Sequence, residues 1–226
     1  MQTIIIKTKP FVDVHIQKEV KKITNKSIKI IEKGFYELKL KEEEITPFIS
    51  ELTFYSRLIE RIYLKIEEFN SIENLKINSN IHESLNNDLT FSLRCEKSFT
   101  QEDHQLIEKK IGEKILKSFP RLIVNLKNPE LPFKILTFNN KNYLTIDLIN
   151  FKLTKRHHKI NLSSTTISSI IPSYLFQLLN LNKEDQLSIL DPCANLGEVI
   201  IEAGLLNKPI HQKLRLTLPS SKLFPI

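Results

Sequence analysis

The sequence has few of the residues that build cysteine-dependent sites. Its 226 residues include two cysteines, one methionine, four glycines and no tryptophan. Cys95 and Cys193 are far apart, form no Cys-x-x-Cys pair and have no histidines at ligand spacing beside them. We therefore expect neither a disulfide framework nor a metal site.

Glycine-rich motifs are also missing. The chain has no P-loop, no Gly-x-Gly-x-x-Gly and no Gly-x-Ser-x-Gly elbow. Their absence excludes the simplest nucleotide-hydrolysing, dinucleotide-binding and hydrolase classes. No pairing of a nucleophile with a base is visible either, so the sequence predicts no catalytic residue.

Long apolar runs are lacking too. The first ten residues hold only Ile4-Ile5-Ile6, bounded by Lys7 and Lys9. This run is too short for a signal peptide or a membrane span. We expect a cytoplasmic protein that does not enter a membrane.

The chain is rich in basic residues. Thirty-three Lys and Arg against 26 Asp and Glu give a formal charge of +7. Such a balance favours polyanionic partners, because binding releases counterions from the polyanion. A composition bias shared by a whole organism would give the same charge, and net charge alone leaves both interpretations open.

Three parts are expected: residues 1–70, 71–160 and 161–226. In the first, the pattern indicates strands, a lysine-rich amphipathic helix, a further strand after Gly34 and a last helix. The ranges are Ile4–Ile6 and nearby Phe11–Ile16 before the lysine-rich helix, Phe35–Leu40 for the strand and Thr53–Phe69 for the last helix. In that helix, apolar residues from Leu52 to Phe69 recur at intervals of three and four.

The middle part is predicted to hold a small mixed sheet and one prominent helix. Alternation predicts a strand over Leu89–Cys95. The helix directs four apolar residues to a core: Leu106, Ile107, Ile111 and Ile115. Three more strands follow at Leu122–Leu126, Phe133–Phe138 and Tyr143–Leu148, separated by turns rich in Asn and Pro.

Basic residues gather at two places in and after this part. Lys110, Lys114 and Lys117 lie at i, i+4 and i+7 on one helix face, with three further candidates nearby: Arg94, Lys109 and Arg121. The run of Lys155, Arg156, His157, His158 and Lys159 joins the middle part to the last. Both groups could contact phosphates. Equally, the first could be a solvated helix face and the second a solvated hinge.

The last part is predicted to begin with a helix within Ile167–Leu181, followed by a strand at Leu187–Leu190 and an acidic turn. The candidate cofactor-binding residues of that turn are Asp191, Pro192, Asn195 and Gly197. A glycine there lets a ligand approach the backbone at a helix N-terminus, where N–H groups are unpaired. An ordinary strand-to-helix turn explains the same residues equally well.

Several stretches resemble a known family. Phe91–Cys95, the Ile111-Gly112-Glu113 helix and Leu126-Lys127-Asn128-Pro129-Glu130 resemble the THUMP domain. Residues 1–70 resemble the ferredoxin-like domain that precedes it in RNA guanine-N2 methyltransferases, with Leu58–Tyr63 matching that domain's terminal helix. The resemblance implies an α+β protein: a ferredoxin-like domain, a THUMP domain and an incomplete Rossmann-like α/β segment. It also implies binding of structured RNA, most of all tRNA.

The last part departs from the family pattern of Asp-Pro-x-x-Gly-x-Gly-Thr, which binds S-adenosylmethionine. Asn195 replaces the first glycine and Glu198 replaces the threonine. The acidic residue expected after Leu214–Leu218 and the Asn/Asp-Pro-Pro-aromatic motif are missing as well. We expect an RNA-binding protein with a truncated methyltransferase segment that has lost methyl transfer.

Two alternatives remain from the sequence. The chain could be the N-terminal part of a split S-adenosylmethionine-dependent tRNA guanine-N2 methyltransferase, in which case a second polypeptide completes the fold and the cofactor site. It could also be a structural or adaptor protein whose basic face is only solvated.

Overall fold

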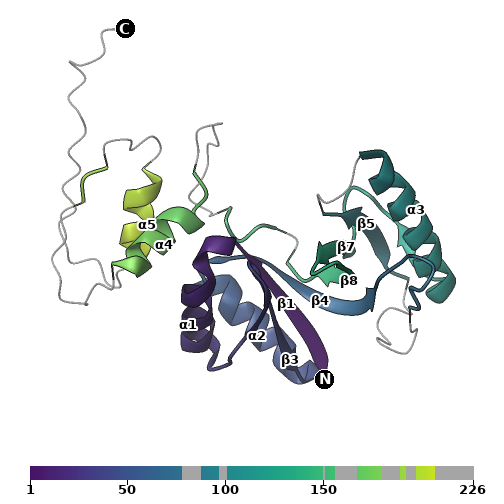
Figure 1. Cartoon of the computed structure of the whole chain (residues 1–226), viewed down its shortest axis with the longest axis horizontal. Coiled ribbons are helices and arrows are strands. Elements are labelled where there is room, and N and C mark those ends of the chain that lie inside the picture. Colours follow the sequence, from purple (N-terminus) through teal and green to yellow (C-terminus); the bar gives the residue numbers. More distant parts are fainter. Residues whose placement is uncertain are drawn as a thin grey trace, which may run out of the picture. The chain divides into compact units, whose positions relative to one another are not determined.

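A computed structural model describes residues 1–77, 88–96, 101–149, 151–155, 167–179, 189–191 and 197–206, and for residues 101–103 only the backbone. The chain forms two compact units, Met1–Leu153 and Thr154–Ile226, called here the first and second unit. The elements follow in chain order (Figure 1): β1 Gln2–Thr8, a 3₁₀ turn Pro10–Val12, α1 Asp13–Thr24, β2 Lys29–Glu32, β3 Phe35–Leu40, α2 Glu42–Tyr55, β4 Ile59–Phe69, β5 Thr90–Cys95, α3 Gln101–Ser118, β6 Ile123–Val124, β7 Leu131–Phe138, β8 Lys141–Asp147, α4 Ile170–Leu178 and α5 Glu198–Leu206.

All eight described strands form one sheet, in the order β2-β3-β1-β4-β8-β7-β5-β6. The elements from β1 to β4 follow the order β-α-β-β-α-β, and their strand pairs are antiparallel. Among the described strands, parallel pairing occurs only where β5 meets β6 and β7. The expected α+β class is therefore observed, with a single mixed sheet in the first unit.

Strand β4 connects the two halves of this sheet. Its residues Ile59–Leu64 pair with β1, and Tyr63–Phe69 pair with β8. The strand therefore lies in the middle of the sheet, and it ends at Phe69, next to the position where the sequence suggested a domain boundary. That boundary stays a prediction.

The predicted helix over Thr53–Phe69 is wrong beyond Tyr55, because the chain from Ile59 onward is a strand. Burial on both faces explains the error: Ile62, Tyr63 and Leu64 are all buried in succession. A central strand covered on both sides loses its alternation, and the remaining apolar spacing imitated a helix. The carboxylate of Glu19 holds the break, since Oε1 accepts hydrogen bonds from Ser56 Oγ and the next two backbone N–H groups.

A second prediction, of extended structure over Phe11–Ile16, is also wrong. Pro10 starts a 3₁₀ turn and Asp13 begins α1. Helix α1 buries Ile16 and Val20 and ends at Asn25, whose left-handed conformation (φ 60°) lets its N–H bond the Lys21 carbonyl.

The other strand predictions in the first unit are confirmed within a few residues, as is the main helix of the middle part. In α3, Ile111 and Ile115 are fully buried as expected, whereas Leu106 is 54% exposed. The prediction for Leu106 is therefore wrong. Half of the strand expected at Leu187–Leu190 lies outside the described residues.

Two turns need unusual backbone conformations. Gly34 connects β2 to β3 with φ 86°, and a Cβ there would lie 3.0 Å from the Thr8 carbonyl oxygen, so only glycine fits without a shift. Asn139 and Asn140 connect β7 to β8 with φ 49° and 56°. This is the geometry of a two-residue hairpin turn, which asparagine tolerates well.

These two hairpins touch each other, although three strands separate β3 from β7 in the sheet. The ring of Phe138 stacks between Phe35, at 4.5 Å, and Tyr143, at 4.1 Å. The N–H of Asn139 donates to Glu32 Oε2 at 2.6 Å, and its side-chain amide donates to the Ile31 carbonyl at 2.8 Å. A flat sheet would hold β3 and β7 roughly 19 Å apart, so the sheet is strongly coiled and closes over its own concave side.

The second unit contains α4 and α5, which pack against each other. Ser173 Oγ of α4 donates to Glu202 Oε2 of α5 at 2.6 Å, and both residues are fully buried. In the described part of the chain, no helix is long and apolar enough to cross a membrane.

The aromatic stack allows a test of how much the contact between the two hairpins contributes to the stability of the fold. Phe138 is 4% exposed, so Phe138→Ala should lower the free energy of unfolding by about 3–5 kcal/mol through lost burial and an unfilled cavity. Urea denaturation followed by circular dichroism measures this. Phe54→Ala is the matched control, because Phe54 is 74% exposed and its loss should cost no more than about 0.5 kcal/mol. Equal midpoints for the two variants would contradict the packing.

Candidate nucleic-acid interface

Helix α3 carries the candidate phosphate contacts on its exposed side. Lys109, Lys110 and Lys117 are exposed, as is Arg121 just after the helix. None of the four forms an ion pair with a residue that the structure describes. We call these four residues the α3 surface; it offers uncompensated positive charge to solvent.

Lys114 was predicted to belong to the same stripe, but the structure gives it internal partners. Its ammonium donates to three backbone carbonyls, at 2.6 Å to Ile72, 3.1 Å to Glu73 and 3.1 Å to Leu75. These carbonyls belong to the turn that follows β4. Lys114 therefore anchors that turn to α3, and its three hydrogen-bond donors are already engaged.

Arg94 also has a partner inside the protein. Its Nη1 lies 3.0 Å from Glu108 Oε2, and the side chain stays 47% exposed. The other oxygen of Glu108 accepts the backbone N–H of Cys95 at 2.8 Å. Burial, with the nearby Glu108 carboxylate, raises the pKa of the Cys95 thiol to about 12. A thiol with this pKa does not supply a nucleophile near neutral pH.

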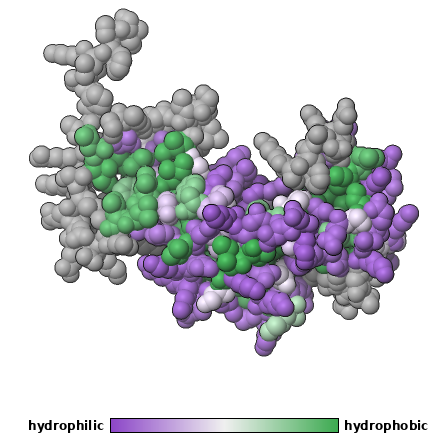
Figure 2. All heavy atoms as spheres, viewed as in Figure 1, coloured by the Kyte–Doolittle hydropathy of each residue, from purple (hydrophilic) through white to green (hydrophobic). Residues whose placement is uncertain are grey.

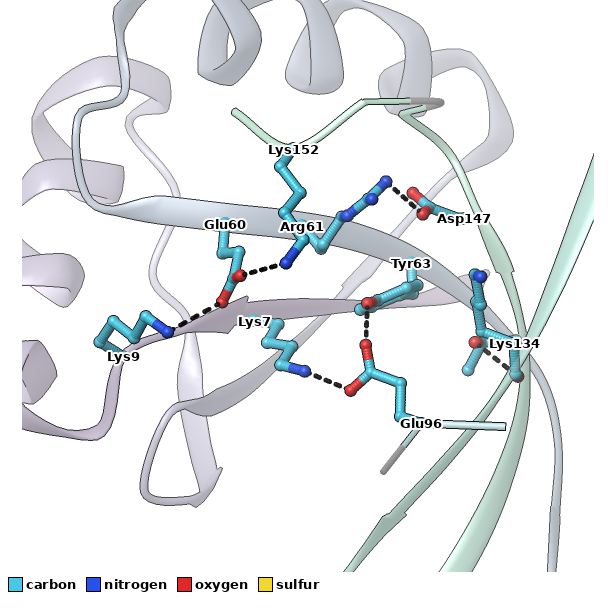
Figure 3. Close-up of polar contacts among 10 residues, drawn as sticks. Lys7, Lys9, Glu60, Arg61, Tyr63, Glu96, Lys134, Asp147 and Lys152 are labelled. Atoms are coloured by element: carbon cyan, nitrogen blue, oxygen red, sulfur yellow. Dashed lines mark hydrogen bonds and ion pairs between the residues drawn. The ribbon is translucent and has the colours of Figure 1, made fainter. Parts of the chain in front are cut away.

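A network of charged side chains connects the two halves of the sheet on its concave side (Figure 3). Glu96, just after β5, forms an ion pair with Lys7 of β1 and accepts a hydrogen bond from Tyr63 Oη of β4 at 2.9 Å. Arg61 of β4 contacts Asp147 Oδ2 of β8 at 2.6 Å and the Ile149 carbonyl at 2.9 Å. These bonds join elements far apart in the sequence and orient the sheet that carries α3.

Burial dominates the electrostatics of this network. It raises the pKa of Tyr63, with Glu96 adding to the shift, and it raises the pKa of Asp147 although Arg61 opposes the shift. It lowers the pKa of Lys134, which lies half-buried on β7. Because the partners are matched within the protein, the network serves the fold, and no group of three or more metal-ligating side chains occurs among the described residues.

The basic junction is described only at its start. Lys155 is exposed. Arg156, His157, His158 and Lys159 lie outside the described residues, so their predicted contact with RNA stays a prediction.

The predicted cofactor turn is described at Asp191 and Gly197, whereas Pro192 and Asn195 lie outside the described residues. Gly197 has φ 75°, and a Cβ there would meet nothing within 4 Å. Glu198 follows it, 4% exposed, with no hydrogen-bond partner for Oε1. Glu198 thus places a carboxylate in the first turn of α5, at the positive end of the helix dipole.

The sequence-based prediction did not include Lys127. This lysine is exposed, and it follows α3 and Arg121 in the sequence. The side chain of Asn125 shapes its turn, because Oδ1 accepts the N–H groups of Lys127 and Asn128 at 3.2 and 3.1 Å. Glu130 ties the end of the turn to β5 through Thr90. In the sequence analysis, the Leu126–Glu130 motif served only to recognise the family. The lysine within this motif was the signal that could have identified a further phosphate contact.

The fold and the α3 surface together define an α+β protein with a basic helix on a mixed sheet. Residues 68–147 match the THUMP domain family, so the predicted resemblance of this stretch to the THUMP domain is confirmed. The match covers β5, α3, β6, β7 and β8. No curated protein matches the chain.

Solved structures share the fold over most of the chain. TrmN from Thermus thermophilus is 17% identical with a TM-score of 0.65, covering 92% of this chain and 63% of that one. A predicted N6-adenine-specific DNA methylase from Listeria monocytogenes is 18% identical, and a possible methylase from Clostridium difficile is 21% identical. Both have a TM-score of 0.65 and cover 91% of this chain and 55% of the other. The chain thus spans less than two thirds of the length of these structures.

The internal role of Lys114 separates it from its neighbours on α3. Lys114→Gln should lower the free energy of unfolding by about 2 kcal/mol, because three carbonyls lose a charged donor. Lys110→Gln, at an exposed position without an ion pair, should change it by less than about 0.5 kcal/mol. Thermal denaturation of the two variants, which have the same charge change, makes the comparison. Equal stability would show that Lys114 does not anchor the turn.

Proposed function

We propose that the protein binds structured RNA through its THUMP domain, and that tRNA is its main target in the cytoplasm. The observation that carries the proposal is the α3 surface, where four exposed cations that form no ion pair with a described residue lie within the stretch that matches a known family. Lysine ammonium groups act as point charges on phosphates. A rigid arrangement of such charges suits a folded RNA, which proteins recognise largely by shape and backbone.

The remaining parts of the chain fit supporting roles. The β-α-β-β-α-β half, which we interpret as a ferredoxin-like domain, shares strand β4 with the THUMP half. The two should therefore bind RNA as one body. The second unit is interpreted as a Rossmann-like segment derived from a methyltransferase.

We further propose that this polypeptide alone does not transfer methyl groups. The buried carboxylate of Glu198 follows Gly197, where the family pattern has a threonine. The acidic side chain in the first helical turn compensates the positive end of the α5 dipole, so an incoming ligand gains less there.

A second candidate function is favoured by the apolar surface of the second unit. Figure 2 shows apolar residues gathered over α4 and α5. Exposed side chains in these helices and at the end of α4 include Leu175 at 49%, Leu178 at 45%, Leu179 at 60% and Leu205 at 37%. An apolar cluster of this kind suits a protein partner, such as a second polypeptide that completes a split RNA guanine-N2 methyltransferase.

RNA binding is tested by gel shift with unmodified tRNA over a series of salt concentrations. Lys109→Gln/Lys110→Gln/Lys117→Gln should weaken binding and reduce the slope of log affinity against log salt by roughly 2–3, since each lost phosphate contact removes about 0.7–0.9. The control carries Lys9→Gln/Lys141→Gln/Lys152→Gln, which loses the same charge at lysines that already face carboxylates: Glu60 at 3.9 and 3.4 Å for Lys9 and Lys152, and Glu68 at 2.5 Å for Lys141. No shift of tRNA by the wild type at low salt, or an unchanged triple variant, would contradict the proposal.

Cofactor binding is tested by calorimetry with S-adenosylmethionine. The chain alone should show no saturable heat, which means a dissociation constant weaker than roughly 1 mM. Micromolar binding of S-adenosylmethionine by the chain alone would contradict the proposal that this polypeptide does not transfer methyl groups. Methyl transfer to tRNA that appears only when a polypeptide with the remaining methyltransferase strands is added would favour the split enzyme.

A further inference from the structure

The most basic segment of the first unit lies outside the THUMP match. Residues 18–41 hold eight lysines and three glutamates, with no arginine or aspartate. The segment covers most of α1 together with β2 and β3. In α3, by contrast, four lysines are accompanied by four acidic residues over positions 101–118.

Two of the three glutamates in this segment are used inside the protein. Glu19 Oε1 accepts three hydrogen bonds at the start of the chain segment leading into β4, from Ser56 Oγ at 2.5 Å and two backbone N–H groups. Glu32 accepts the Asn139 N–H at 2.6 Å, in the contact between the hairpins. These carboxylates are oriented by the fold toward backbone groups far away in the sequence.

Most of the lysines are therefore left without counter-charges. Lys26 pairs with Glu44 at 2.7 Å and Lys41 lies 3.8 Å from Glu43. The other six are exposed and form no ion pair with any residue that the structure describes: Lys18, Lys21, Lys22, Lys29, Lys33 and Lys39. On α1, Lys18, Lys21 and Lys22 share one face through their i, i+3 and i+4 spacing.

Part of this segment surrounds a hollow of about 520 Å³ at the β2–β3 edge. Lys26, Lys29 and Lys39 line it with Ser27 and Leu38, and Glu37 contributes one carboxylate. Glu37 stands opposite Lys29 in the strand register and two residues before Lys39. The three side chains therefore emerge on the same face of the sheet, and the charge of the hollow remains net positive.

We propose that Lys29 and Lys39 at the hollow form a second contact surface for the RNA backbone, called here the N-terminal basic surface. This inference rests on the proposed RNA binding and adds a site outside the THUMP domain. Two charges on one face of the hairpin, neither in an ion pair with a described residue, match neighbouring phosphates of a folded RNA. Lys21 and Lys22 belong to α1, which packs on the other face of the sheet through the bond between Tyr36 and Asp13.

The surface is suited to phosphates and not to unpaired bases. Proteins that bind single strands stack the bases on exposed aromatic rings. Between Asp13 and Lys41, the large apolar side chains that are exposed are Val14 and Ile30, and neither is aromatic. The segment's aromatic residues, Phe35 and Tyr36, are half-buried and buried.

The test compares double variants of the full chain that lose the same charge. Lys29→Gln/Lys39→Gln should weaken tRNA binding roughly tenfold near 0.1 M salt and lower the salt slope by about 1.5. Lys21→Gln/Lys22→Gln, on the other side of the sheet, should change both values much less. Lys9→Gln/Lys152→Gln is the control, because both lysines already face Glu60, at 3.9 and 3.4 Å. It should bind like the wild type. Circular dichroism of each variant confirms that it is folded.

The outcomes separate this inference from the proposed function. Binding that falls in the α3 variant and not in Lys29→Gln/Lys39→Gln would overturn the N-terminal basic surface and leave RNA binding intact. Failure of the wild type to bind any RNA would overturn both. Sedimentation with vesicles containing anionic phospholipid serves as the second arm: lysine-dependent binding to vesicles, with RNA binding unchanged, would assign the surface to membranes and overturn the inference.

Discussion

The first unit depends on strand β4 being shared between two sets of partners. Through one end it completes the β-α-β-β-α-β half, and through the other it starts the THUMP half. Because both ladders use one backbone, neither half can rotate against the other without breaking hydrogen bonds. The contact between the β2–β3 and β7–β8 hairpins then closes the sheet from its far side. The cations on α1 and α3 are in this way fixed to one rigid support.

Local patterns predicted the elements whose burial is one-sided. The alternation of β5 and the apolar spacing of Ile111 and Ile115 come from elements with one covered face, and both were predicted correctly. The pattern failed at β4, since a strand covered on both faces has no alternation to detect. The end of α2 could not be predicted because Glu19, some 37 residues before Ser56, supplies the bonds that hold the break.

The candidate site was predictable in composition but not in detail. Spacing placed Lys110, Lys114 and Lys117 together, and only the fold shows that Lys114 bonds a turn about 40 residues away in sequence. The lysines before β3 showed the opposite problem. Their sequence neighbours Glu19 and Glu32 suggest neutralisation, yet both acids bond distant backbone groups. Whether a lysine is free to bind a phosphate therefore depends on contacts with residues far away in the sequence. A short stretch of sequence does not reveal those contacts.

The double use of β4 also affects how the chain is made. During synthesis the first half of β4 can pair with β1 at once, but its partner strand β8 emerges roughly 70 residues later, which takes several seconds at usual rates of translation. For that interval Ile66 and Phe69 belong to an open strand edge, which can pair with the wrong chain. Lys65, Glu67 and Glu68 alternate with them, and charged residues in such a strand discourage mispairing. The charges of β4 thus protect the nascent protein before they serve the finished fold.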